Sequence, residues 1–338
     1  MPDAYDPVDS PDETTIFSYH DLAPPDVADV YRARTVVSRH LPRTPLVRSE
    51  PLSATLEADV FLKREDTLPT GAFKVRGGLT LADGLAESFR DPGLIAASTG
   101  NHGQSVAYAG REYDVPVTIC VPADANPRKT DAIEALGAEV VRRGETFDDA
   151  REHAEALAAE AGYRYVHSGN EPALVAGVAT AGLEVVEDLP EVDLVLTPVG
   201  GGSSAAGYCL TVGDLADAAV VGVQSEAAPA MYRAWREDTL AAHDRMETFA
   251  EGLATSVPFA LTTRVLRDRL DDFHLVSDDD LRAAMRWLLR EDGVVAEGAS
   301  AAPVAAALAA GDELAGRTVV IPISGRNLSL SKLRAVVD

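Results

Sequence analysis

Short apolar runs alternate with longer helical patterns along most of this chain. Parallel strands need a crossover connection, and a helix usually supplies it. The alternation therefore predicts an α/β fold with parallel sheets covered by helices on both faces. The predicted strands are residues 59–65, 94–98, 117–122, 139–144, 163–167, 193–199, 220–226, 273–277 and 318–324. The predicted helices are residues 102–113, 128–137, 146–161, 172–187, 203–211, 279–291 and 299–310, with one more starting near residue 25.

The charge of the chain restricts its partners. The net charge is −24, and the acidic residues are spread along the sequence. Nucleic acids and anionic membranes are not expected partners, because both need clustered Lys and Arg. Only four lysines accompany the many arginines. This bias predicts a halophilic protein, whose carboxylates keep it hydrated in high salt; an ordinary acidic cytosolic protein is the alternative.

The two cysteines and the first residues bear on the compartment. Cys120 and Cys209 lie in apolar runs outside any CxxC or Cys/His cluster. We therefore predict that both cysteines are buried in the core and that they form neither a metal site nor a disulfide. Residues 1–15 are polar and do not resemble a signal peptide, and no apolar run approaches the ~20 residues that cross a bilayer. We therefore expect a cytoplasmic protein.

Three turns between strands and helices carry most of the polar chemistry. They are STGNHGQ (98–104), GGGSS (200–204) and GRNLS (325–329). In doubly wound sheets, the loops at the carboxyl ends of the strands face a common crevice. We therefore expect these three turns to lie together.

The glycine-rich turn is a candidate phosphate site. Consecutive glycines allow close approach of the backbone, and the next helix offers free N–H groups at its start. Residues 198–207 also contain a weak dinucleotide fingerprint, but the following strand ends in Gln224 rather than an acidic residue. Dinucleotide binding and a simple tight turn remain alternatives. The residues expected around a phosphate are Gly200, Gly201, Gly202, Ser203 and Ser204.

The STGNHGQ turn has more polar side chains than a helix start needs. One Ser, Thr or Asn is enough to cap a helix, so a capping turn is the simpler alternative. The excess suggests a site for a small carboxylate. Its polar residues are Ser98, Thr99, Asn101, His102 and Gln104.

Lys74 stands between apolar Phe73 and Val75, beside a glycine-rich turn. Partial burial lowers the pKa of a lysine and makes it a better nucleophile. Next to a phosphate site, such an amine suits a Schiff base with pyridoxal phosphate. The alternative is a structural lysine paired with Glu65 or Asp66.

Four stretches in this order resemble the pyridoxal-phosphate enzymes of the tryptophan-synthase-β-like fold (fold type II), especially the serine/threonine dehydratases. They are residues 43–78, 98–110, 198–207 and 321–327. The resemblance implies two doubly wound domains, a large one (25–92 plus 171–338) that binds the cofactor and a small one (93–170) that carries the asparagine turn, after an acidic arm (1–24). It also implies a homodimer or homotetramer that deaminates L-threonine, and L-serine as well, by β-elimination to a 2-oxo acid and ammonia.

The resemblance further implies roles for single residues. Lys74 would hold the cofactor covalently and act as general base, with Phe73 beside the pyridine ring. Asn101 would bond the phenolic oxygen, residues 200–204 would cradle the phosphate, and Ser324 would lie opposite the pyridine nitrogen. Its neutral hydroxyl favours elimination over a long-lived carbanion. The residues expected near the substrate are Ser98, Thr99, His102, Gln104 and Glu297.

Some positions depart from the family pattern. Arg326 replaces a glycine of the final loop, and Thr99 replaces the second serine that the racemases use. A serine racemase, another eliminating or replacing enzyme of the same fold, and a non-catalytic amino-acid-binding relative remain alternatives. Gln224 stands where some relatives carry a metal-binding glutamate, so we expect no metal. Because the chain ends soon after the final loop, we expect no regulatory domain of the biosynthetic type.

Overall fold

The computed structural model describes residues 22–85, 87, 89–237, 239–242 and 246–337. Most of the predicted acidic arm therefore lies outside the described residues. The helices are α1 (Val27–His40), α2 (Glu50–Leu56), α3 (Val75–Leu85), α4 (Asn101–Tyr113), α5 (Pro127–Glu134), α6 (Phe147–Ala161), α7 (Pro172–Asp188), α8 (Ser203–Tyr208), α9 (Asp214–Ala216), α10 (Ala230–Glu237), α11 (Ala260–Arg269), α12 (Asp278–Trp287), α13 (Gly298–Ala310) and α14 (Leu330–Val337). The strands are β1 (Leu46–Arg48), β2 (Asp59–Lys63), β3 (Leu94–Ala97), β4 (Val117–Val121), β5 (Glu139–Arg142), β6 (Arg164–Tyr165), β7 (Leu194–Pro198), β8 (Ala219–Ser225), β9 (Asp272–Val276) and β10 (Thr318–Pro322).

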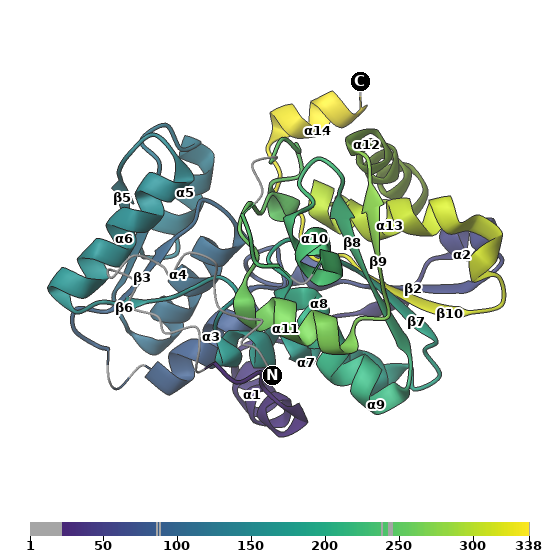
Figure 1. The fold of residues 1–338 in the computed structure, drawn as a ribbon, viewed down its shortest axis with the longest axis horizontal. Coiled ribbons are helices and arrows are strands. Elements are labelled where there is room, and N and C mark those ends of the chain that lie inside the picture. Colours follow the sequence, from purple (N-terminus) through teal and green to yellow (C-terminus); the bar gives the residue numbers. More distant parts are fainter. Residues whose placement is uncertain (1–21, 86, 88, 238, 243–245, 338) are drawn as a thin grey trace.

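The strands form two sheets, which lie in separate halves of the molecule in Figure 1. The larger sheet has the order β1-β2-β10-β7-β8-β9, and only its edge strand β1 is antiparallel to its neighbour. The smaller sheet has the order β5-β4-β3-β6 and is entirely parallel. The predicted α/β class with parallel sheets is confirmed.

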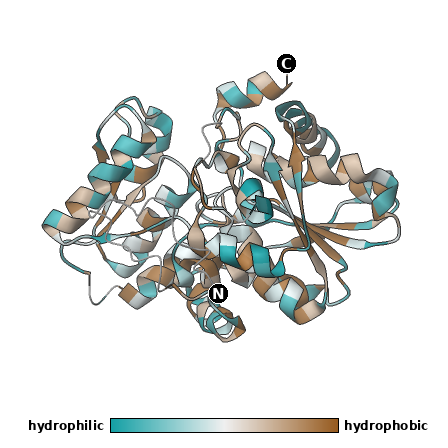
Figure 2. Cartoon of the chain, viewed as in Figure 1, coloured by the Kyte–Doolittle hydropathy of each residue, from teal (hydrophilic) through white to brown (hydrophobic). Residues whose placement is uncertain are grey.

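Both faces of the larger sheet are covered, and β7 shows why the sequence demands this. Leu194 and Leu196 enter the core under α12 and α13, whereas Val195 between them enters the core formed with α7, α8 and α11. Side chains of a strand alternate between faces, so a strand that is apolar throughout needs helices on both sides. In Figure 2 the strands of this sheet are mostly brown, and the outer faces of the surrounding helices carry more teal.

Helix α3 occupies a stretch that the sequence suggested as a glycine-rich turn. A β-carbon on Gly77 would lie 2.7 Å from the carbonyl oxygen of Leu174, and one on Gly78 would lie 2.7 Å from that of Ser105. The glycines therefore allow α3 to pack closely against α7 and α4. Its Leu79 enters the same core cluster as β3 and β4.

The four strands of the smaller sheet all fall within residues 93–170. We propose that residues 93–170 form the small domain and that residues 25–92 with 171–338 form the large one. In this division α3 belongs to the large domain by sequence and packs into the core of the smaller sheet. Within the described ranges, no helix is long and apolar enough to cross a membrane.

Candidate active site

The segment before Lys74 is bound to the final loop, which follows β10. Ala72 and Gly325 form an antiparallel bridge, and the backbone N–H of Phe73 donates to the carbonyl oxygen of Ser324 at 2.9 Å. Residues distant in the sequence are thereby fixed beside each other. The start of α3 and the carboxyl end of β10 thus share one edge of the larger sheet.

Both polar contacts of the Lys74 amine are with neutral groups. Its Nζ donates to the carbonyl oxygen of Ser168 at 2.8 Å and to Oγ of Ser203 at 2.9 Å. Burial lowers the pKa of Lys74 to about 8, because the cation is poorly solvated there. The structure thus brings the predicted nucleophile to the predicted phosphate turn.

The alternative pairing of Lys74 with a nearby carboxylate is wrong. Glu65 accepts from Nε of Arg76 at 2.7 Å, and Asp66 accepts from Nε of Arg64 at 2.8 Å. These carboxylates are therefore neutralised by arginines. The Lys74 amine is not held as half of an ion pair with either of them.

The glycine-rich turn leads from β7 into α8, which begins at Ser203. A β-carbon on Gly200 would clash with the carbonyl oxygen of Gly252, so no larger residue fits without movement. Gly202 has a φ of +83°, in the left-handed region that glycine tolerates best. Ser204 turns to Thr197, with 3.2 Å between their hydroxyl oxygens. Of the two serines, Ser203 is the one whose hydroxyl contacts Lys74.

Asn101, the first residue of α4, is held by two side chains from the other half of the molecule. Its Nδ2 donates to Oε1 of Glu297 at 2.8 Å, and its Oδ1 accepts from Nδ2 of Asn327 at 2.8 Å. Asn327 also donates to the carbonyl oxygen of Thr70 at 2.8 Å. Asn327 was not predicted as a site residue, although it lies in the final loop that carried the resemblance.

Glu297 titrates in an unusual range. Burial raises the pKa of its carboxyl group to about 7, against the opposite effect of N–H donors from Asn101 and the Asn327 backbone. The carboxyl group therefore changes its charge near neutral pH. Throughout this titration range the Glu297 carboxyl group accepts a hydrogen bond from Asn101, which connects the two halves of the molecule.

Ser324, two residues after the end of β10, belongs to a hydrogen-bond network. Its Oγ lies 2.9 Å from Oγ of Ser300, and Ser300 also donates to the carbonyl oxygen of Gly325 and accepts from its N–H, both at 2.7 Å. Ser300 belongs to the helix that starts just after Glu297. Its role was also missed, because only the tertiary fold brings α13 against this loop.

The remaining residues predicted near a substrate carboxylate lie in the turn before α4 and in the first turn of that helix. Oγ of Ser98 accepts from the N–H of Gly100 at 3.1 Å, and Thr99 and Gln104 are half-buried. The His102 ring is buried, with Nε2 3.0 Å from the carbonyl oxygen of Val166. Burial and the charge of Lys74 lower the pKa of His102 to about 3, so its ring is neutral at ordinary pH.

Comparison with known proteins identifies the chemistry. The family model described as "Pyridoxal-phosphate dependent enzyme" matches residues 37–325. The chain belongs to this family. Its cofactor is therefore pyridoxal phosphate. The prediction of a pyridoxal-phosphate-dependent enzyme of fold type II is confirmed.

Similar proteins include several that act on threonine. The L-threonine ammonia-lyase of Thermotoga maritima is 35% identical over 311 residues, which are 92% of this chain and 77% of that protein. A catabolic L-threonine dehydratase of Staphylococcus aureus is 33% identical over 92% of both chains. Among solved structures, the processed form of threonine deaminase isoform 2 from Solanum lycopersicum has a TM-score of 0.86, with 30% identity over 93% of this chain and 94% of that one. The serine racemase of Dictyostelium discoideum has a TM-score of 0.85, with 29% identity over 91% of this chain and 100% of that one.

The donors of the site fit this cofactor. An aldehyde needs an amine that can lose its proton, and the pKa of Lys74 is about 8. A phosphate needs N–H and hydroxyl donors, and the glycine turn offers both beside that amine. Within the described ranges, no group of three or more His, Cys, Asp or Glu side chains could hold a metal ion.

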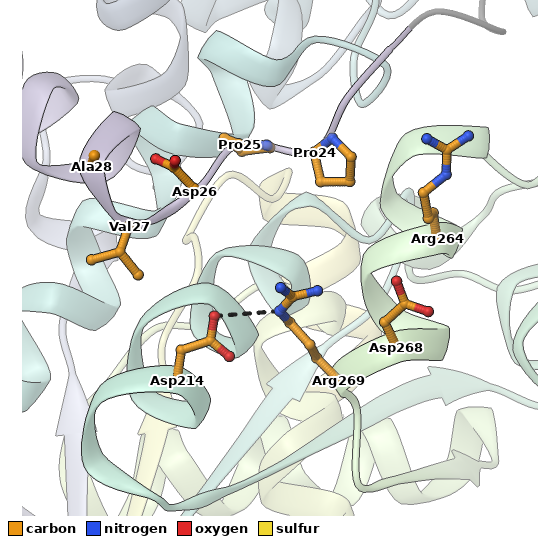
Figure 3. Close-up of a pocket in the computed structure, with 9 residues that line it drawn as sticks. All are labelled: Pro24, Pro25, Asp26, Val27, Ala28, Asp214, Arg264, Asp268 and Arg269. Carbon is orange, nitrogen blue, oxygen red and sulfur yellow. Dashed lines mark hydrogen bonds and ion pairs between the residues drawn. The ribbon is translucent and has the colours of Figure 1, made fainter.

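The structure also has a depression on its outer surface, separate from the site around Lys74. It has a volume of about 550 Å³ and lies among α1, α9 and α11 (Figure 3). An ion pair between Asp214 and Arg269 lines it, together with Arg264 and Asp268. None of its nine lining residues belongs to the turns that surround Lys74.

Proposed function

We propose that this enzyme deaminates L-threonine, and L-serine as well, by β-elimination to a 2-oxo acid and ammonia. The observation that carries the proposal is the Lys74 amine, which has neutral contacts, a lowered pKa and a place beside the glycine turn. The names of the relatives supply the substrate class, because the similar curated proteins are threonine ammonia-lyases and dehydratases.

Each turn has its own task in holding the cofactor. Lys74 would bind its aldehyde carbon covalently, with Phe73 beside the ring. Asn101 would donate to the phenolic oxygen, and its orientation is fixed by Asn327. The backbone of the glycine turn and the hydroxyls of the serines would bind the phosphate. The residues proposed for the phosphate are Gly200, Gly201, Gly202, Ser203 and Ser204.

When bound, pyridoxal phosphate withdraws the electrons that are released as the Cα–H bond breaks. Lys74 would accept that proton at Nζ as the general base. The bond from Cβ to the hydroxyl oxygen then breaks, and the oxygen leaves as water with a proton from a nearby donor. Addition of water to the unsaturated product releases ammonia and the 2-oxo acid.

We assign Ser324 to the pyridine nitrogen because its hydroxyl is buried and neutral. The bond to Ser300 fixes that hydroxyl in place. A neutral partner does not hold a proton on the pyridine nitrogen as a carboxylate would. Ser324 would thereby favour prompt loss of the β-substituent.

The turn before α4 would receive the substrate carboxylate. Ser98 and Thr99 are proposed there, with His102 and Gln104 from the first turn of α4, and Glu297 is proposed as a further contact of the substrate. The neutral ring of His102 can take part only as a hydrogen-bonding group, not as a cation. The backbone N–H groups at the start of α4 therefore supply most of the attraction for a carboxylate.

The setting of the enzyme is also proposed. Two free, buried cysteines, Cys120 and Cys209, agree with a reducing cytoplasm. The net charge of −24 and the scarcity of lysine support a halophilic enzyme. We propose a homodimer or homotetramer of this chain, with no nucleic-acid or membrane partner.

Purified protein loaded with pyridoxal phosphate and given L-threonine tests the function. We expect equal amounts of 2-oxo acid and ammonia, and no activity from the matched variant Lys74→Ala. Formation of neither product, from L-threonine or from L-serine, would contradict the proposal.

Serine racemisation is the second candidate, because a serine racemase is among the similar structures. Thr99, with its extra methyl group, stands where the resemblance places the second serine of racemases. Chiral analysis of the L-serine reaction separates the two activities. D-serine without 2-oxo acid would identify a racemase.

A further inference from the structure

The four lysines have a distinct distribution in the fold. Lys63 is fully buried and contacts Glu184 at 2.6 Å, and Lys74 belongs to the active site. The other two, Lys129 and Lys332, both form ion pairs with Glu251. A chain that uses arginine nearly everywhere has thus placed both of its partly exposed lysines on one carboxylate.

Glu251 begins a short 3-10 turn, Glu251–Leu253, that packs against the phosphate turn at Gly200. The carbonyl oxygen of Gly252 lies against Gly200 of the phosphate turn, where it leaves no room for a β-carbon on Gly200. A β-carbon on Gly252 would in turn lie 3.8 Å from Oε1 of Glu297. This turn therefore lies beside both the phosphate turn and Glu297.

The two lysines reach the turn from different halves of the molecule. Lys129 lies on α5, beside the smaller sheet, whereas Lys332 lies on α14 and also donates to the carbonyl oxygen of Phe249 at 3.1 Å. Lys332 thus holds the turn within its own half. Lys129 connects the turn to the half that carries the STGNHGQ turn.

Partial exposure makes this contact reversible. The side chains of Lys129, Glu251 and Lys332 are 25%, 54% and 37% exposed. Ion pairs this exposed contribute little to stability. A single ammonium point charge on a flexible stem exchanges partners easily, whereas the planar guanidinium of arginine binds a carboxylate with two parallel bonds.

We propose that Lys129 and Lys332 are positioning residues that hold the turn Glu251–Leu253 against the phosphate turn, and that the Lys129–Glu251 contact opens and closes during turnover. Lysine suits a contact that must break in each cycle. The inference rests on the proposed deaminase function, because it assigns the contact a part in substrate entry and product release.

Three variants of the holoenzyme test the proposal: Lys129→Gln, Lys129→Arg and, as a matched control, Arg128→Gln. Arg128 is the exposed neighbour of Lys129 on α5. Kinetics with L-threonine give kcat and KM. Hydrogen exchange followed by mass spectrometry gives the protection of the backbone around Glu251, which does not depend on activity.

We expect Lys129→Gln to raise KM about two- to fivefold, the change that an exposed ion pair provides, and to speed exchange at the turn. Lys129→Arg should keep the turn protected and lower kcat and KM together, because a firmer contact opens less often. Arg128→Gln should match the wild type in both measurements.

Two results would overturn the proposal. In the first, both Lys129 variants have the kcat, KM and hydrogen exchange of the wild type. In the second, Arg128→Gln changes these quantities as much as Lys129→Gln does. If the wild type deaminates nothing, the proposed function fails. In that case, hydrogen exchange around Glu251 that is unchanged in Lys129→Gln would show independently that the Lys129–Glu251 contact does not hold the turn.

Discussion

Replacing Glu297 with glutamine should stabilise the protein at high pH far more than at low pH. Glutamine has the shape of the protonated side chain and keeps an oxygen that can accept from Asn101. It cannot ionise, so the variant avoids placing a charge in this poorly solvated position. At low pH the Glu297 carboxyl group and the glutamine side chain are both neutral, so the wild type and the variant differ only in local hydrogen bonding.

The pKa of Glu297 sets the size of the effect. Burial raises it from 4.5 to about 7, so the folded protein holds a proton that the unfolded chain has lost between these values. The stability of the wild type is therefore full below pH 4.5, falls as the pH rises to 7 and is constant above it. Each pKa unit corresponds to about 1.4 kcal/mol, so the variant should gain about 2 to 3 kcal/mol on the wild type between about pH 5 and pH 8.

Urea unfolding at these two pH values measures the change. Glu313→Gln, at an exposed carboxylate, is the matched control and should show no such dependence on pH. The same difference between Glu297→Gln and the wild type at both pH values would refute the reasoning. It would mean that the Glu297 carboxyl group is already ionised at the lower pH.

Two further results follow from the buried charges. Cofactor-free protein should bind pyridoxal phosphate faster as the pH rises, by about tenfold per pH unit until near pH 8, because only the neutral Lys74 amine attacks an aldehyde. Stopped-flow absorbance measures this rate. A rate that does not change across neutral pH would contradict the prediction. Arg76→Met should cost about 3 to 5 kcal/mol in urea unfolding, because it leaves the buried Glu65 without its arginine partner and Glu184 with Lys63 alone. Arg32→Met, at an exposed ion pair, should change stability far less, and equal losses in the two arginine variants would count against the buried-pair argument.

Most of the strands and many of the helices were predictable from local patterns. Runs such as residues 193–199 are apolar at nearly every position, which a strand covered on both faces requires, and β7 forms there. Helix α3 was missed because Gly77 and Gly78 look like turn residues. They are glycines because two other helices leave no space for a side chain. Helices α10 and α11 also lacked a clear prediction.

The local sequence determined the chemistry of this protein, because an amine, a glycine turn and a helix start with hydroxyl groups keep their character wherever the chain takes them. Tertiary structure decided which groups meet. Asn327 and Ser300 became parts of the site, and Glu251 became the shared partner of two lysines, through contacts between residues far apart along the chain. Spacing along a sequence carries no record of such distances. The pKa values of Lys74 and Glu297 likewise depend on burial, which only the packed structure defines.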